Sequence, residues 1–368
     1  SEALELVEIC AIATVCDVVD LKSENRIIVK AGLEKLNNSK NKGVIALRKA
    51  CDLEEKELTA YHLGFVIGPC INATGRLEVA DIAVELLTTD DDMVAEELAN
   101  KLVDLNERRK ELTAKSVEEV MEQIEKDKLY NDKVIMVYNP NIHESIAGIV
   151  AGRVKETYNL PTIVMTKGSK MPKGSARSIE EYNMFEELSK CKNLMDKFGG
   201  HPMAAGLSAK EENLPKIKAF LNENCPLSDE DVVPKIKIDT AISVGDLSEE
   251  IIETITKLEP FGKGNATPVI AAKGIYVKSM RTMGADKNHL RFECVDKNTR
   301  RTVNGVMFSA VDNFREIYDD RFGDGSFDRD ANGRGRDFCI DVIYKPSINE
   351  FRGSRNIQMI INNIRISK

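Results

Sequence analysis

The sequence contains no tryptophan, and aromatic residues make up only 5% of its 368 positions. Few rings are therefore available to stack on nucleobases, and any such contact depends on Phe, Tyr, His or Arg side chains. The eight cysteines include no C-x-x-C pair, the spacing typical of zinc sites. We therefore expect reduced, buried thiols and no bound zinc.

Long apolar runs are also missing. No stretch is long enough to cross a bilayer and the first residues do not resemble a signal peptide, so we expect a cytoplasmic protein with no membrane partner. The net charge of −8 argues against nonspecific coating of nucleic acid, although it allows a local basic groove. The length and the 42% hydrophobic content suffice for two or three domains.

Residues 1–129 combine helical patterns with short apolar runs. Residues 1–90 alternate helical patterns with short apolar runs, and the glycine-punctuated stretch 64–77 predicts a loop. Residues 91–129 carry one amphipathic pattern, preceded by Thr and Asp residues that suit a helix start. This pattern predicts a long helix that connects domains, with a coiled-coil arm as the alternative.

The remaining residues predict an α/β domain and a barrel. Residues 130–228 alternate strand and helix patterns, which indicates a sheet with helices packed on it. Residues 229–368 contain five or six β-type runs, typical of an antiparallel barrel such as an oligonucleotide-binding (OB) fold. The Gly-, Asp- and Arg-rich stretch 319–337 predicts a mobile loop.

The segment FGGHPMAAGLS, residues 198–208, concentrates small residues around one histidine. Gly199 and Gly200 permit backbone angles that other residues avoid and let a ligand approach the main chain. We predict a tight turn in which His201 is able to hydrogen-bond a phosphate or pair with a charge. A structural turn with a satisfied histidine is the alternative.

The segment PKGSARS predicts a second turn that suits a terminal phosphate. Lys173 and Arg177 bring positive charge, and Ser175 and Ser178 bring hydroxyl groups. The spacing is not that of a nucleotide P-loop. A solvated basic turn is the alternative.

Three further positions are candidates. His143 stands at a strand-to-helix junction, where helix N-termini attract anions. Asn72 and Arg76 lie in the predicted loop, where Arg76 can hold a phosphodiester or form a salt bridge. Asp17 follows an apolar run, and a carboxylate at a strand end is a usual metal ligand, although a lone one also serves as a cap.

Together these motifs resemble the RecJ-type exonucleases of the DHH phosphoesterase superfamily. The segments that carry the resemblance, in the family's order and approximate spacing, are ATVCDVVDLKSENRIIVKAGLEKLN, GFVIGPCINATGRLEVADIAVELLTTDD, HESIAGIVAGRV, KGSARSI and FGGHPMAAGLS. LEPFGKGNATPV resembles the segment that leads into the family's OB-like domain. The resemblance covers nearly the whole chain. It implies an α/β fold with the C-terminal part of a DHH catalytic domain (1–90), a connecting helix (91–129), a DHH-associated α/β domain with the GGH motif (130–228) and an OB-like β-barrel (229–368).

The family degrades single-stranded DNA from its 5′ end, in DNA repair and recombination, with Mn²⁺ or Mg²⁺ held by Asp and His. By resemblance, Asp17 matches the last metal-binding aspartate, and Ser175 and Arg177 match the pocket for the 5′ phosphate. Arg76 and His201 match positions near the scissile phosphate, so the implied catalytic residues are Asp17, Arg76 and His201. A single-strand-binding protein and a helicase are implied as partners.

The family's earlier Asp-x-Asp, Asp and Asp-His-His motifs are missing, since no two of the four histidines are adjacent. One carboxylate cannot hold a hard cation that prefers about six oxygen ligands. We therefore expect an inactive fragment that keeps substrate-binding parts and holds no metal tightly. A non-catalytic protein that binds single-stranded nucleic acid and a phosphodiesterase for short oligonucleotides remain the alternatives. In the barrel, the aromatic candidates for base stacking are Tyr276, Phe292, Phe308 and Tyr344.

Overall fold

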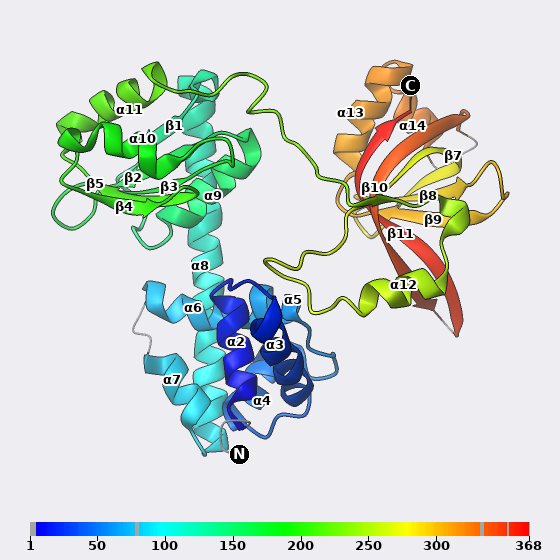
Figure 1. Ribbon diagram of the computed structural model, residues 1–368, viewed down its shortest axis with the longest axis horizontal. Coiled ribbons are helices and arrows are strands. Elements are labelled where there is room, and N and C mark those ends of the chain that lie inside the picture. Colours follow the sequence, from blue (N-terminus) through cyan, green and yellow to red (C-terminus); the bar gives the residue numbers. More distant parts are fainter. Residues whose placement is uncertain (1–4, 78–80, 332–334, 352, 368) are drawn as a thin grey trace. The chain divides into compact units, whose positions relative to one another are not determined.

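The computed structural model describes residues 5–77, 81–331, 335–351 and 353–367, with the backbone alone for Arg76, Leu77 and Phe351. Its contacts divide the chain into two compact units. The first unit comprises Ser1–Asp17 and Ala31–Lys235, and the second comprises Val18–Lys30 and Ile236–Lys368. Figure 1 shows the elements of both.

The N-terminal part of the chain is helical and closely packed. A Cβ atom on Gly43 would collide with the carbonyl oxygen of Leu86, and one on Gly32 would collide with the Cβ of Ala11. Both glycines therefore let helix backbones approach one another. The helices are α2 (Val7–Cys16), α3 (Ser23–Leu36), α4 (Lys42–Ala50), α5 (Ala60–His62), η1 (Leu63–Ile67), α6 (Gly68–Leu77) and α7 (Asp81–Thr88).

The prediction of a loop over 64–77 is wrong, because a π-helical turn, η1, continues there into α6. Pro69 lies in the first turn of α6, where a helix tolerates proline. Gly68 faces α2, and a Cβ atom on it would lie 2.5 Å from the Sγ of Cys16. Glycine and proline in this stretch therefore serve helix packing and helix initiation rather than a turn.

The predicted long helix is confirmed as α8 (Asp92–Asp127). Its N-cap, Asp91, accepts hydrogen bonds from the N–H groups of Met93 and Val94 at 2.8 and 3.2 Å. The first half of α8 packs against α4, α6 and α7. Val120 and Ile124 in its second half belong to the core of the α/β domain, so one helix contributes to both parts of the unit.

A five-stranded sheet forms the centre of the α/β domain. The strand order is β1-β2-β3-β5-β4, with β1 and β2 parallel and the other pairs antiparallel. The α8–α9 core covers one face, and a core that includes α10 and α11 covers the other. The elements are η2 (Leu129–Asn131), β1 (Ile135–Tyr138), α9 (Ala147–Tyr158), β2 (Thr162–Thr166), β3 (Lys173–Arg177), α10 (Met184–Lys190), η3 (Lys192–Leu194), β4 (Lys197–His201), β5 (Ala204–Ser208), η4 (Glu211–Asn213) and α11 (Leu214–Glu223).

The second unit contains the predicted barrel. Its sheet order is β10-β11-β9-β8-β7-β6, and a further pairing of β10 with β7 closes it. Most pairs are antiparallel, whereas β11–β9 and β6–β7 are parallel. The elements are β6 (Thr240–Ala241), η5 (Val244–Asp246), α12 (Glu249–Thr256), β7 (Ile270–Met283), β8 (His289–Val295), β9 (Thr302–Met307), α13 (Val311–Phe322), α14 (Ser326–Asp330), β10 (Phe338–Phe351) and β11 (Ser354–Ile366).

The expected mobile loop over 319–337 is wrong for its first part, because residues 319–322 end α13 and residues 326–330 form α14. Apolar burial explains the difference. Phe327 is 1% exposed and packs edge-on to Phe314, and Phe322 packs against Tyr318. Residues 332–334 of this stretch lie outside the described residues.

All eight cysteines are free thiols. In the part of the chain that the structure describes, no helix is both long and apolar enough to cross a membrane.

Candidate functional site

Three neighbouring strands present alternate residues on one face of the α/β sheet. β5 pairs with both β3 and β4, so Ser175, Gly206 and Gly199 lie in one row across the strands. Residues two positions apart in a strand point to the same face. We call this set the open face. It consists of Lys173, Ser175 and Arg177 on β3, Ala204, Gly206 and Ser208 on β5, and Lys197, Gly199 and His201 on β4.

Burial follows the same alternation. The intervening residues Gly174, Ala176, Ala205 and Leu207 are buried, whereas every open-face residue is exposed or half-buried. The prediction of a turn at KGSARS is therefore wrong, whereas the tight turn expected at His201 is present directly after it, at Pro202 and Met203, and the two glycines lie in the strand before it. Hydrogen bonding to β2 and β5 outweighs the weak strand preference of these small residues, and the chain reverses after His201, between β4 and β5.

The glycines of the FGGH hairpin have two different roles. A Cβ atom on Gly199 would meet nothing within 4 Å, and one on Gly206 would have its nearest neighbour at 3.9 Å. Neither residue has a positive φ. Gly200, in contrast, has a φ of 153° and its Cβ atom would collide with the backbone of Ala204. Gly200 is therefore required by the hairpin, while Gly199 and Gly206 leave the floor of the open face accessible to a ligand.

A cleft of about 650 Å³ lies over the open face, and the segment that leads into α9 forms one wall. In that wall His143 Nδ1 lies 2.7 Å from Ser145 Oγ, and Glu144 forms an ion pair of 3.0 Å with Lys173. The N-terminus of α9 opens on the cleft, an arrangement that favours anions. The lining residues are Gly75, His143, Glu144, Ser145, Ala147, Lys173, Gly174, Ser175, Lys197, Phe198, Gly199, Gly206, Leu207 and Ser208.

Lysines flank the floor of this cleft on both sides. Lys173 on β3 and Lys197 on β4 are each paired with Ser208 of the strand between them. Neighbouring strands lie about 4.8 Å apart, so the two lysine backbones are roughly 10 Å apart. Because Glu144 compensates the charge of Lys173, Lys197 is the main cation here, and with the hydroxyls of Ser175 and Ser208 and the bare backbone between them it suits a phosphodiester, which needs charge, donors and close approach.

Arg177 and His201 occupy the far row of the open face, on either side of Ala204. They therefore share one face of the sheet, although neither lines the cleft itself. The Arg177 guanidinium donates a hydrogen bond of 2.8 Å to the carbonyl oxygen of Ala176. A Cβ atom on Gly148 of α9 would lie 2.6 Å from Arg177 Nη2, so Gly148 makes room for this side chain.

Other candidate residues lie elsewhere. Ser178 is 1% exposed, and its hydroxyl donates a 2.6 Å hydrogen bond to the carbonyl oxygen of Tyr182, so it does not reach the open face. Asn72 is exposed on α6, the helix whose Gly75 lines the cleft. The side chain of Arg76 lies outside the described residues.

Sequence reasoning missed Lys197, Gly206 and Ser208. The available signal is weak, because only Phe198 and Leu207 stand as single large apolar residues between polar or small neighbours, in KFG and GLS, the two-residue pattern typical of strands. Read as a hairpin, the segment KFGGHPMAAGLS places Lys197, Gly199 and His201 on one face together with Ala204, Gly206 and Ser208.

The residues present do not fit a metal centre. Asp17 is the exposed C-cap of helix α2, so the expectation that it ends a strand is wrong. Within residues 5–77, 81–331, 335–351 and 353–367, no three His, Cys, Asp or Glu side chains are grouped so as to hold a metal ion. A single carboxylate falls far short of the roughly six oxygen ligands that Mg²⁺ or Mn²⁺ takes.

Among the four aromatic candidates of the barrel, Phe308 has the most exposed side chain. Phe308 is 55% exposed and contacts the ring of His289 at 5.3 Å. Phe292 and Tyr344 are buried in the core, and the hydroxyl of Tyr276 is bonded to Asp337 at 2.6 Å. The expectation of surface stacking is therefore wrong for Phe292 and Tyr344.

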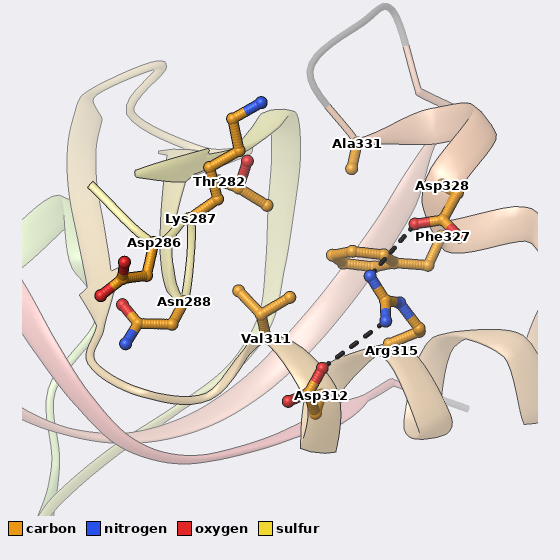
Figure 2. Close-up of a pocket in the computed structure, with 10 residues that line it drawn as sticks. All are labelled: Thr282, Asp286, Lys287, Asn288, Val311, Asp312, Arg315, Phe327, Asp328 and Ala331. Atoms are coloured by element: carbon orange, nitrogen blue, oxygen red, sulfur yellow. Dashed lines mark hydrogen bonds and ion pairs between the residues drawn. The ribbon is translucent and has the colours of Figure 1, made fainter. Parts of the chain in front are cut away.

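The barrel also contains a pocket of about 310 Å³ between the β7–β8 turn and helices α13 and α14. Figure 2 shows the guanidinium of Arg315 held between Asp312 and Asp328, at 3.5 and 3.2 Å. The same group lies 5.3 Å from the ring centre of Phe327. Two carboxylates therefore compensate the charge of Arg315 in this pocket.

Two models of known protein families match parts of this chain. Residues 131–225 match the family model described as the DHHA1 domain, and residues 238–363 match the RecJ OB domain. The chain is 32% identical over 370 residues to the single-stranded-DNA-specific exonuclease RecJ of Bacillus subtilis, covering 99% of this chain and 44% of that protein. It is also 32% identical over 374 residues to RecJ of Escherichia coli, covering 98% of this chain and 61% of that protein.

A solved structure shows the same fold. The crystal structure of RecJ from Thermus thermophilus in complex with Mn²⁺ superposes with a TM-score of 0.78 at 26% identity, covering 98% of this chain and 50% of that one. The chain thus spans about half the length of the relatives it matches.

Fold and site together define an α/β protein with a helical N-terminal region, a DHHA1 domain and an OB domain. The chain is a homologue of the RecJ family of single-stranded-DNA-specific exonucleases. The resemblance identified from the motifs is therefore confirmed, as is the fold class.

Proposed function

We propose that the open face binds the sugar–phosphate backbone of single-stranded DNA. On this proposal the chain supplies the substrate-binding part of a RecJ-type 5′-to-3′ exonuclease. The observation that carries the proposal is the bare floor at Gly199 and Gly206 between Lys173 and Lys197, because no residue that the structure describes occupies the space that side chains would take there.

The rows of the open face suggest a role for each side chain. Ser175 and Arg177 lie on the same face of β3 and would hold the terminal 5′ phosphate, with the N-terminus of α9 contributing backbone donors. His201 lies two strands from Arg177 and would offset negative charge on the adjacent phosphodiester. In the barrel, the exposed Phe308 would stack on a base of single-stranded DNA.

Discrimination between 5′ ends tests this assignment. We expect a single-stranded oligonucleotide with a 5′ phosphate to bind several-fold more tightly than the same strand with a 5′ hydroxyl, as measured by fluorescence anisotropy. Ser175→Ala should reduce that preference. Ser189→Ala on α10, whose hydroxyl bonds the carbonyl oxygen of Phe185, is the matched control and should keep it.

Two results would overturn the proposal. Equal affinity of the unmodified chain for strands with a 5′ phosphate and with a 5′ hydroxyl would show that the chain has no pocket that recognises the 5′ phosphate. Affinity for dinucleotides equal to that for long strands would instead favour a phosphodiesterase that acts on short oligonucleotides.

We further propose that this chain alone does not hydrolyse DNA, because its described residues provide no set of metal ligands. End-labelled single-stranded DNA incubated with the purified chain and Mn²⁺ should keep its length while it remains bound. Release of mononucleotides by the unmodified chain, abolished by Asp17→Ala, would show that the chain assembles a working centre and would contradict this expectation.

A further inference from the structure

Two thiols of the helical region face each other. The Sγ atoms of Cys51 and Cys70 lie 3.9 Å apart, although the residues are 19 positions apart in the sequence. Cys51 is half-buried and forms the C-cap of α4, whereas Cys70 is 2% exposed in the first turn of α6. The pair therefore joins the end of one helix to the start of another.

The surroundings of Cys70 favour its thiolate. The hydrogen bond between the two thiols lowers the pKa of Cys70, the positive charge of Lys110 and a hydrogen bond from Asn106 act in the same direction, and burial opposes them. Asn106 Nδ2 lies 3.4 Å from Cys70 Sγ. The Asn106 amide is itself fixed, because its oxygen accepts hydrogen bonds from Arg109 Nε and Nη2 at 3.2 and 2.8 Å. The thiolate is the reactive form of cysteine, so Cys70 is the expected nucleophile.

We propose that Cys51 and Cys70 form a reversible disulfide when the protein meets hydrogen peroxide. The sulfur of Cys70 attacks one peroxide oxygen, the O–O bond breaks, and the departing hydroxide leaves as water with the Cys70 proton. The resulting sulfenic acid is attacked by the sulfur of Cys51. Its S–O bond then breaks, and a second water leaves with the Cys51 proton. Two thiols lose two electrons and two protons, and one peroxide is reduced to two waters.

The geometry requires only a small movement. A disulfide has an S–S bond of about 2.05 Å, so the two sulfurs, now 3.9 Å apart, must approach by about 1.9 Å. The new bond would fasten the start of α6 to the end of α4. α6 also carries Asn72, and its Gly75 lines the cleft, so the link would act on a helix at the edge of the proposed DNA site.

Mass spectrometry of the full chain tests the proposal. After treatment with dilute peroxide and alkylation of the remaining thiols, we expect one linked peptide pair that contains Cys51 and Cys70, and its loss on reduction with dithiothreitol. Because the bond closes a loop in the unfolded chain, the midpoint of thermal unfolding should rise by several degrees and return on reduction.

Two variants distinguish oxidation of the Cys51–Cys70 pair from oxidation of another thiol of the chain. Cys51→Ser should abolish both the linked peptides and the rise in the unfolding midpoint. Cys10→Ser, which removes an exposed thiol of the same unit, should preserve both. The proposal is overturned if peroxide oxidises Cys10 of the unmodified chain while the thiols of Cys51 and Cys70 stay reduced and are alkylated afterwards. It is also overturned if Cys51→Ser still shows the rise in the unfolding midpoint after peroxide treatment.

Discussion

At the scale of single residues, the structure separates two uses of glycine that look the same in the sequence. Gly43 and Gly200 are glycines because protein atoms fill the space where a side chain would stand. Gly199 and Gly206 have open space there. A substitution to alanine therefore tests packing at the first two positions and ligand approach at the other two.

Gly199→Ala and Gly206→Ala should weaken binding of single-stranded DNA without loss of stability. A methyl group on the floor of the cleft would hold the phosphodiester away from the backbone, and we expect about a tenfold loss of affinity, which corresponds to about 1.4 kcal/mol. Gly152→Ala on α9 is the matched control, because its Cβ atom also meets nothing within 4 Å and Gly152 does not line the cleft. Equal affinity of all three variants and the unmodified chain would contradict a ligand at this floor.

The candidate site could be predicted in part from residue types alone. Lys173, Ser175, Gly199 and His143 line the cleft as their chemistry indicated, because phosphate recognition draws on a short list of side chains. Ser178 has the same chemistry as Ser175 but lies in the buried interior, bonded to Tyr182. Only the register of β3 distinguishes the two serines, and register depends on the partner strands.

At the scale of elements, the predictions failed where small residues are held by distant partners. KGSARS and FGGH suggest turns because glycine and serine are typical turn residues, yet β2 and β5 provide the hydrogen bonds that make both segments strands. Helix α8 could be predicted because its apolar spacing and its cap are both local. Helix α8 is therefore predictable from its own residues, whereas β3 and β4 depend on hydrogen bonds to partner strands.

The β8–β9 turn offers a test of stability at this scale. The carboxylate of Asp296 accepts hydrogen bonds from the N–H of Thr299 at 2.8 Å and from the hydroxyl of Ser243 at 2.7 Å, and these bonds lower its pKa to about 2. The carboxylate therefore favours the folded chain above the ordinary pKa of 3.8, and this contribution disappears as the pH falls through 2.

Asp296→Asn should accordingly lower the midpoint of thermal unfolding by a few degrees near neutral pH. The gap between variant and unmodified chain should narrow as the pH falls below 4, since protonation removes the same charge from the unmodified chain. Asp320→Asn, an exposed position on α13, is the control and should change little. A gap that is constant with pH, or equal in both variants, would show that the Asp296 charge does not hold the turn.

At the scale of the whole molecule, the compact units do not follow the order of the chain. Residues 18–30 belong with the barrel, because Leu21 donates a 2.7 Å hydrogen bond to the carbonyl of Lys263 and Arg26 donates to the carbonyls of Leu258 and Glu259 at 3.2 and 2.9 Å. Arg26 and Glu259 are 233 positions apart in the sequence. No local sequence pattern predicts a contact over such a distance. The sequence-based domain boundaries therefore place residues 18–30 with the rest of residues 1–90.

The net charge of −8 opposes DNA at long range, so on the proposed function binding would depend on local cations such as Lys197 of the open face. If about three phosphates are neutralised there, the logarithm of the binding constant should fall with the logarithm of salt concentration with a slope of about −2 for a single strand. Lys197→Gln should make that slope shallower by about 0.7, because one contact is lost.

Lys216→Gln, an exposed lysine of α11 outside the open face, should leave the slope unchanged. Anisotropy titrations over a series of salt concentrations measure the slope. A slope that is flat in the unmodified chain, or that Lys216→Gln reduces as much as Lys197→Gln, would mean that DNA binds elsewhere on the molecule.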